Sequence, residues 1–466
     1  MRGNKYIKNI SSLPIFFFTF YFLLSLINNV CMGANPKQTL FPIISLVTIF
    51  IIYIVFKGNE EHLTNQNLNT IIVIFFITNL IIYITGKFNV ESGFLKIIKT
   101  KFGINMKLAM IISSFFMLLK WVFIKNNNLL KDIFIYTIIF FVIPLLLIPF
   151  IYPNPDIDLY IILKQSIRDL SLNIDPYLRV YPDIYKGAYD YAYQKQPVKL
   201  VYWPMNLYLL YPFQHILGDL RWGYIFSLIF GALILFFGIE RKWKVLFISG
   251  ILLFGNAFTF HIIRFAWIDP LTFPITALYF VFTYKNKYFL SFVFLGILVS
   301  LKLYFIFFIP ISMVYYLKNV NSLKKAIFYL SVTVIVAILC FVPFIFSNTD
   351  GIIYSLKYFA NSRPRLDSLS IPGYLFKFKY ETSNIFMAIF FVLYVWILYR
   401  SYNNNNNNNK EIQNHIADFG VVLFIFFIFS KQAFGNYYYN LIYLSIMFIC
   451  FKSFSIKRIV NSQKHN

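Results

Sequence analysis

The sequence predicts an all-α fold, a polytopic membrane helix bundle of about 13 to 14 spans with amphipathic helices in its large outer loops. Of the 466 residues, 59% are hydrophobic and only 13% are charged, whereas soluble globular domains carry about 25% charged residues. The apolar residues form blocks that are long enough to cross a hydrocarbon layer of about 30 Å. The 42 Lys and Arg outnumber the 18 Asp and Glu, and they flank these blocks, as is typical of membrane proteins. These features argue against a soluble enzyme, a nucleic-acid binder and a disordered chain.

Each apolar block defines one expected span. The spans lie near 14–32, 39–56, 70–86, 106–124, 132–152, 221–239, 245–263, 269–284, 288–301, 303–317, 326–347, 384–400, 417–430 and 437–453. The first block also resembles a signal peptide, but the spans that follow it closely favour a membrane helix. The run 203–217 is apolar, short and contains two prolines, so we expect it to be re-entrant or packed against the bundle.

The basic loops predict the orientation of the spans. The basic segment 2–8 places the amino terminus in the cytosol, and a count of five spans then places the long polar stretch 153–202 on the outer side. The next return loop, 241–244, is basic, as expected for the cytosol. The lysines between 87 and 107 disagree, because this count places them outside. We expect the asparagine-rich segment 401–412 to be a disordered cytosolic insertion and 454–466 to be a basic cytosolic tail.

Acidic residues concentrate in the outer loop after the fifth span. Six of the 18 lie between 156 and 190. Asp156 and Asp158 precede a run, 159–170, whose apolar residues have helical spacing, while Lys164 and Arg168 share the opposite face. Such a helix lies in the membrane interface. The two carboxylates are therefore either helix caps or a general base at the membrane surface, where low polarity raises a carboxyl pKa.

Several short motifs in this order resemble the polytopic glycosyltransferases of the GT-C superfamily, and most closely the glycosyltransferase 87 or alpha-mannosyltransferase-like proteins. The matching segments are Asp156-Ile-Asp-Leu-Tyr160, Asp175-Pro176-Tyr177, Tyr202-Trp203-Pro204, Trp267-Ile268-Asp269, Leu301-Lys302-Leu303 and the run from Lys431 to Tyr438. Two positions depart from the family pattern, because Met205 and Leu303 stand where family members often have proline. The likeness covers 132–453, the expected transferase core, and leaves 1–131 as accessory membrane helices.

The resemblance implies an inverting transferase that moves a hexose, with mannose favoured, from a polyprenyl- or dolichyl-phosphate donor. The acceptor would be a lumenal lipid-linked sugar or glycan, and the enzyme would lie in the endoplasmic reticulum or another internal membrane. By position Asp156 matches the family's catalytic base, and Asp158 is its competitor. The expected substrate-binding residues are Tyr160, Tyr177, Tyr202, Trp203, Arg264, Asp269, Lys302, Arg363, Lys431 and Gln432. We expect neither a metal nor a cofactor, and no nucleic-acid partner.

Structural roles compete with these assignments. Asp269 precedes Pro270 and could cap a helix, Arg264 could snorkel, and Lys302 could mark a turn between spans. Arg363 could be solvated, and the pair at 431–432 could anchor a helix end. A non-enzymatic multi-pass transporter or channel is the alternative function. It predicts ionisable residues within the spans, whereas the acidic residues here lie in loops and at helix ends.

Overall fold

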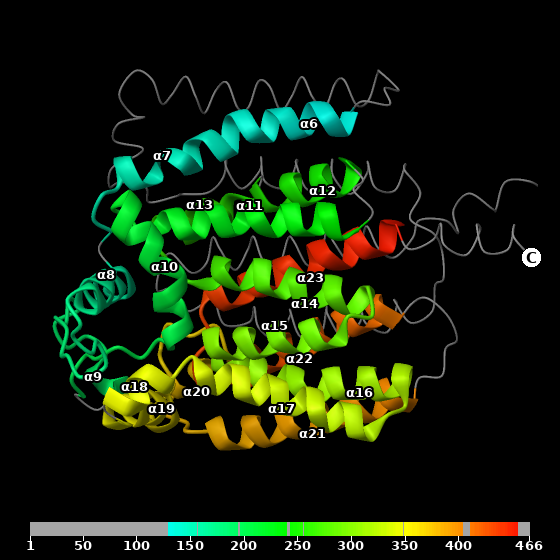
Figure 1. Ribbon diagram of the computed structural model, residues 1–466. Helices are drawn as coiled ribbons and strands as arrows, with labels where there is room; N and C mark the ends of the chain where they lie inside the picture. Colours follow the sequence, from blue (N-terminus) through cyan, green and yellow to red (C-terminus); the bar gives the residue numbers. More distant parts are fainter. Residues whose placement is uncertain are drawn as a thin grey trace, which may run out of the picture. The chain divides into compact units, whose positions relative to one another are not determined.

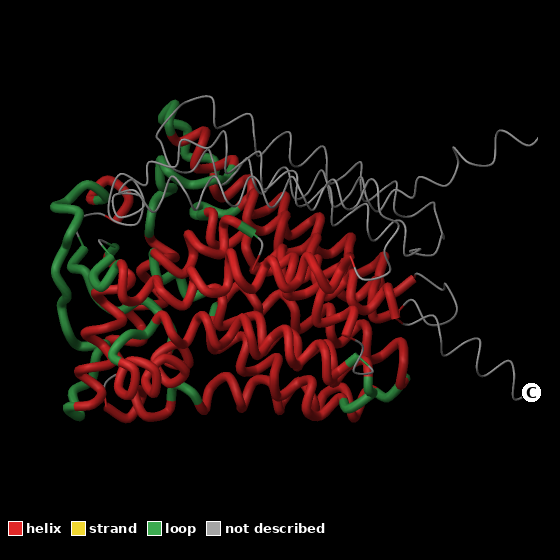
Figure 2. Tube along the Cα trace, turned by 90° about the horizontal axis from the view of Figure 1, so that it is seen from above, coloured by secondary structure: helices red, strands yellow, loops and turns green. Residues whose placement is uncertain are grey.

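The computed structural model describes residues 129–155, 157–193, 196–239, 243–254, 256–347, 349–403 and 411–454. This part of the chain is mostly helical and contains no strand (Figures 1 and 2). The expected spans 14–32, 39–56, 70–86 and 106–124 lie outside the described residues. So do Asp156, most of the asparagine-rich segment and almost all of the basic tail.

The chain divides into two compact units. The described residues of the first unit are 129–152, 247–254 and 256–261. The expected span 132–152 is here a continuous helical run. It consists of α6 (Leu129–Thr137), the π-helix η2 (Ile138–Val142) and α7 (Ile143–Ile151). Phe134 of α6 packs on Phe247, with ring centroids 4.9 Å apart.

The expected span 245–263 corresponds to two helices, α12 (Trp243–Phe254) and α13 (Ala257–Arg264). The second begins beside Asn256, whose carbonyl oxygen accepts a hydrogen bond from Thr259 N at 2.9 Å. The Thr259 hydroxyl donates to the Leu253 carbonyl oxygen at 2.6 Å. The side chain thus satisfies a carbonyl that the end of α12 leaves open. Hydropathy does not reveal such a break, because both helices are apolar.

The second unit contains the amphipathic helix, the long polar stretch 157–203 and most of the described helices that correspond to expected spans. Its helices before 270 are α8 (Asp158–Ser171), α9 (Asp190–Tyr193), α10 (Pro204–Leu217), α11 (Arg221–Gly238) and η3 (Asp269–Leu271). The middle of the unit has α14 (Thr272–Tyr284), α15 (Tyr288–Leu301), η4 (Leu303–Phe307), α16 (Phe308–Val320), α17 (Leu323–Leu339) and α18 (Val342–Ser347). The last helices are α19 (Thr349–Asn361), α20 (Ile371–Phe376), α21 (Ser383–Asn403), α22 (Glu411–Phe429) and α23 (Gly435–Phe454).

The long helices of this unit pack side by side, with α14 between α11 and α15 and with α17 against α15 (Figure 1). Small residues allow this close approach. At Gly296 of α15 an added β-carbon would lie 2.6 Å from the carbonyl oxygen of Thr333 in α17. The run 203–217 forms α10, which packs against α8, α11 and α15, as one of the two expectations for it stated.

Four helical segments among the described residues are long and apolar enough to cross a membrane. They are Arg221–Gly238, Leu303–Val320, Ser383–Asn403 and Ile412–Phe429. The short helices α8, α9, α18, α19 and α20 gather at one end of the packed helices in the second unit (Figure 1). The candidate site lies among the loops that join them.

Candidate functional site

Three segments that are far apart in the sequence meet at this end of the second unit. They are 157–203, 349–382 and 430–434. Backbone and side-chain hydrogen bonds join them, so the long polar stretch 157–203 lies against the segment 349–382. The bonds run from Arg363 N to Ala192 O at 2.9 Å, from Ser355 Oγ to Leu200 O at 2.9 Å and from Leu369 N to Ala433 O at 2.6 Å.

Asp158 is the first residue of α8, which begins after the extended residue Ile157. Its Oδ1 accepts hydrogen bonds from Leu159 N at 2.7 Å and from the Tyr185 hydroxyl at 3.3 Å. Burial raises the pKa of the Asp158 carboxyl, although these two hydrogen bonds and the charge of Arg365 act in the opposite direction. A carboxyl with a raised pKa is suited to accept a proton from a hydroxyl near neutral pH.

Tyr185 contacts this carboxyl, and three further tyrosines lie within its electrostatic reach. Burial raises the pKa of the hydroxyls of Tyr185, Tyr193, Tyr202 and Tyr358, and the negative charge of Asp158 adds to the rise at each. These hydroxyls therefore stay protonated at physiological pH and keep a hydrogen-bond donor. A carboxylate beside several neutral hydroxyls and aromatic rings can bind a polyhydroxylated ligand such as a sugar.

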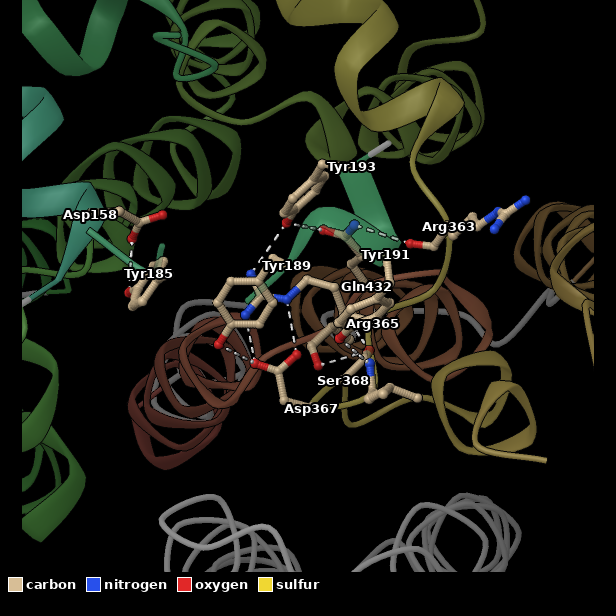
Figure 3. Close-up of polar contacts among 12 residues, drawn as sticks. Asp158, Tyr185, Tyr189, Tyr191, Tyr193, Arg363, Arg365, Asp367, Ser368 and Gln432 are labelled. Atoms are coloured by element: carbon tan, nitrogen blue, oxygen red, sulfur yellow. Dashed lines mark hydrogen bonds and ion pairs between the residues drawn. The ribbon is translucent and has the colours of Figure 1, made fainter. Parts of the chain in front are cut away.

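Arg365 organises the neighbouring part of the cluster (Figure 3). Its guanidinium makes a bidentate ion pair with Asp367, at 2.9 and 2.6 Å, and donates to the Tyr193 hydroxyl at 3.2 Å. The same group lies 3.8 Å from the ring centroid of Tyr189 and 4.5 Å from that of Phe434. Arginine suits this position because its planar group stacks on aromatic rings while its N–H groups bind a carboxylate. Asp367, Tyr193 and two aromatic rings thus hold the Arg365 guanidinium in place, and its charge acts on Asp158.

Gln432 connects the third segment to the other two (Figure 3). Its Oε1 accepts from the Tyr193 hydroxyl at 3.4 Å, and its Nε2 donates to Ser362 Oγ at 3.1 Å. The neighbouring Lys431 is half-buried, and burial lowers the pKa of its ammonium group while the charge of Glu381 opposes this change. Of the two residues predicted to bind substrate here, Gln432 lies inside the cluster and Lys431 lies at its edge.

Asp269 and Lys302 form a second, buried polar cluster. Lys302 Nζ lies 2.6 Å from Asp269 Oδ1. Asn436 and Asn440 donate to the same carboxylate at 2.7 and 2.8 Å, and the Tyr304 hydroxyl lies 3.5 Å away. Asp269 and Lys302 were both expected to bind substrate, and in the structure they bind each other. These contacts join η3, the residue that follows α15 and the start of α23.

Two of the predicted tyrosines are held by other contacts. Tyr160 is buried, and its hydroxyl donates to Pro153 O at 3.2 Å and to Asp219 Oδ2 at 3.3 Å. Burial and the negative charge of Asp219 raise the pKa of Tyr160 to about 12. Tyr177 is also buried and donates to Tyr202 O at 2.6 Å. Neither hydroxyl shares a hydrogen bond with Asp158.

The remaining predicted residues lie at different places. Trp203 precedes α10 and packs edge-on against Phe341, with ring centroids 4.8 Å apart. Arg264 ends α13, and its guanidinium lies 5.0 Å from the ring centroid of Phe265. The Arg363 side chain is more than half exposed, lies 3.4 Å from Glu381 and points away from the Arg365 network (Figure 3).

Tyr189, Tyr193, Asp367, Asn436 and Asn440 contribute to the two clusters but were not predicted as site residues. A local signal existed for some of them. Tyrosines alternate at 189, 191 and 193, and the two asparagines lie one helical turn apart on α23. Neither signal shows which acidic or basic group the side chains would contact.

The described residues contain no group of three or more His, Cys, Asp and Glu side chains that could hold a metal ion. Comparison with known proteins gives no further assignment. No protein-family model matches the chain, and no curated protein shows significant similarity to it.

Proposed function

We propose that this protein is a multi-pass membrane glycosyltransferase of the GT-C type. It would move a hexose, with mannose favoured, from a polyprenyl- or dolichyl-phosphate donor to a lumenal lipid-linked or glycan acceptor. The observation that carries the proposal is the Asp158 carboxyl. Burial raises its pKa at a point where the two large outer loops and the segment before α23 meet.

Each step of the proposed reaction requires a particular group in this site. An acceptor hydroxyl gives its proton to the carboxylate, and its oxygen attacks the anomeric carbon of the donor sugar with inversion. The bond between that carbon and the phosphate oxygen breaks, and the lipid phosphate leaves with the bonding electron pair. The hydroxyls around Asp158 would orient the sugars, and the half-buried Lys431 and the exposed Arg363 remain candidates for the phosphate. Asp156 remains an alternative base, because it lies outside the described residues.

The surroundings of Asp158 support an enzyme better than a transporter or channel. One feature favours the alternative, because α22, a helix long and apolar enough to cross a membrane, contains the buried His415 and also Asp418, whose carboxylate accepts a hydrogen bond from Ser401. His415 lies in the first turns of that helix, however, and its Nε2 is paired with the Tyr279 hydroxyl at 2.7 Å. A histidine that is paired near a helix end is weaker support for a transport path than ionisable groups in the middle of a span.

A transfer assay with purified full-length protein tests the proposal. The donors are a panel of radiolabelled polyprenyl-phosphate sugars, and the acceptors are lipid-linked sugars. Asp158→Asn removes the base and keeps the shape, and the loss of a general base costs about 10²- to 10⁴-fold in rate. Asp190→Asn is the matched control, because Asp190 is an exposed carboxylate in the same segment 157–203 and, like Asp158, is the first residue of a helix. We expect the control to retain wild-type transfer.

Two results would count against the assignment. Normal transfer by Asp158→Asn together with loss in Asp156→Asn would move the base to Asp156. Normal transfer by both single variants and by the double variant would remove the carboxylate base from this loop altogether.

A further inference from the structure

A cavity of about 610 Å³ lies between α8 and α10, and among the described residues that line it two side chains, both cations, are formally charged. Lys164 and Arg168 line it from α8, and Gln214 and His215 line it from the end of α10. No Asp or Glu is among the described residues that line this cavity. The positive charges of these two side chains are therefore not paired with a carboxylate among the described lining residues.

The two cations are neighbours on one face of α8, one helical turn apart. In the described part of the chain neither makes an ion pair, and Lys164 Nζ lies 5.4 Å from the centroid of the Tyr160 ring. Two like charges at this spacing repel each other. An anion held between them would remove the repulsion and accept hydrogen bonds from both.

Apolar side chains beside the cavity indicate that the anion belongs to a lipid. Ile216 and Leu217 directly follow His215, and they are 75% and 46% exposed. α8 itself buries Leu159, Ile162 and Leu163 on its other side, as an interfacial helix does. A ligand with a charged head and acyl chains would satisfy the cations and cover the exposed apolar residues together.

We infer that this cavity binds the phosphate group of an anionic membrane lipid, with Lys164 and Arg168 as its ligands. Arginine binds phosphate oxygens through paired N–H groups, and lysine adds a second positive charge. With about 3.6 residues per turn, Lys164 and Arg168 face a different side of α8 from Asp158. Asp158 is not among the described residues that line the cavity, so the inference does not depend on Asp158 as the base.

Photolabelling tests the inference with full-length protein in phosphatidylcholine nanodiscs that contain a photoactivatable phosphatidic acid. Peptide mapping by mass spectrometry then measures the labelling of α8 and of the end of α10. In the double variant Lys164→Gln, Arg168→Gln we expect labelling at subsaturating probe to fall at least about tenfold, since hydrogen bonds to charged groups are lost. The variant Lys164→Arg, Arg168→Lys keeps both charges and should retain most of the labelling.

The control is Lys357→Gln, Lys377→Gln, which removes two exposed cations outside the cavity and should leave labelling unchanged. Thermal unfolding of all variants establishes that each is folded. Equal labelling of wild type and the Lys164→Gln, Arg168→Gln variant would overturn the inference, as would equal labelling by a phosphatidylcholine probe. Excess inorganic phosphate separates the two sources of the anion. Labelling that survives it supports a lipid, and labelling that it abolishes would assign the cavity to free phosphate instead.

Discussion

Replacing Gly351 by alanine tests the packing that brings the segments 157–203 and 349–382 together. Gly351 lies in the first turn of α19, against Tyr177 of the other loop. A β-carbon at this position would lie 2.5 Å from Tyr177 Cβ and 2.9 Å from its carbonyl oxygen. Rotation of the Tyr177 side chain cannot relieve this clash, because both atoms belong to the backbone or adjoin it. The ring is also fixed at its far end, where the hydroxyl donates to Tyr202 O at 2.6 Å.

The alanine must therefore displace α19 or the Tyr177 loop. Inserting one carbon into a tightly packed site costs about 1–3 kcal/mol, and we expect Gly351→Ala to lower the free energy of unfolding by this amount. Gly420→Ala is the matched control. It places the same carbon in α22, where no described atom outside the neighbouring backbone of the same helix lies within 4 Å, and alanine favours a helix over glycine by up to about 1 kcal/mol. The control should be neutral or stabilising.

Thermal unfolding of the purified full-length variants in detergent measures the difference. Limited proteolysis adds a local measurement, because displacement of α19 should expose 349–382 to cleavage before the rest of the chain. Should the two variants unfold at the same temperature with the same cleavage pattern, α19 does not pack on Tyr177 as described. The conclusion that these loops form one site would then lose its main structural support.

Two further predictions concern the buried ion pair and the candidate base. Lys302→Met leaves the Asp269 carboxylate buried without its cation, which should cost about 3–5 kcal/mol in thermal unfolding. The double variant Lys302→Met, Asp269→Asn should recover part of the lost stability, because it removes the unpaired charge. If the double variant is no more stable than Lys302→Met, the reasoning is wrong. Asp158 should destabilise the folded protein at high pH. Its pKa is higher in the folded protein than in the unfolded chain. Between these two pKa values the folded state keeps a proton that the unfolded state has lost, so the free energy of unfolding falls as the pH rises through the folded pKa. Asp158→Asn should therefore melt above wild type by a margin that grows from about pH 4 upward, and a constant margin would exclude the raised pKa.

The sequence predicted the helices of the described part well because hydropathy is a local property. The expected span 288–301 coincides with α15, and the amphipathic run 159–170 lies within α8, Asp158–Ser171. The pattern also placed Lys164 and Arg168 on one face, and both line the same cavity. Helix breaks were less visible. The expected span 326–347 is interrupted between α17 and α18, at Cys340 and Phe341, where the residues remain apolar.

Composition and periodicity by themselves determined that this chain is helical, that several of its helices suit a bilayer, and that acidic residues gather in one loop. They could not determine the partners of those residues. Asp269 meets Asn436 and Asn440, and Arg365 meets Tyr189 and Tyr193, across more than 160 intervening positions in each case. The helical period fixes the direction of a side chain around the axis of its helix. The neighbours of that side chain depend on how distant loops fold back over the bundle. For this reason Tyr160, two residues from Asp158, binds Asp219 on another side of α8, and only the tertiary structure revealed it.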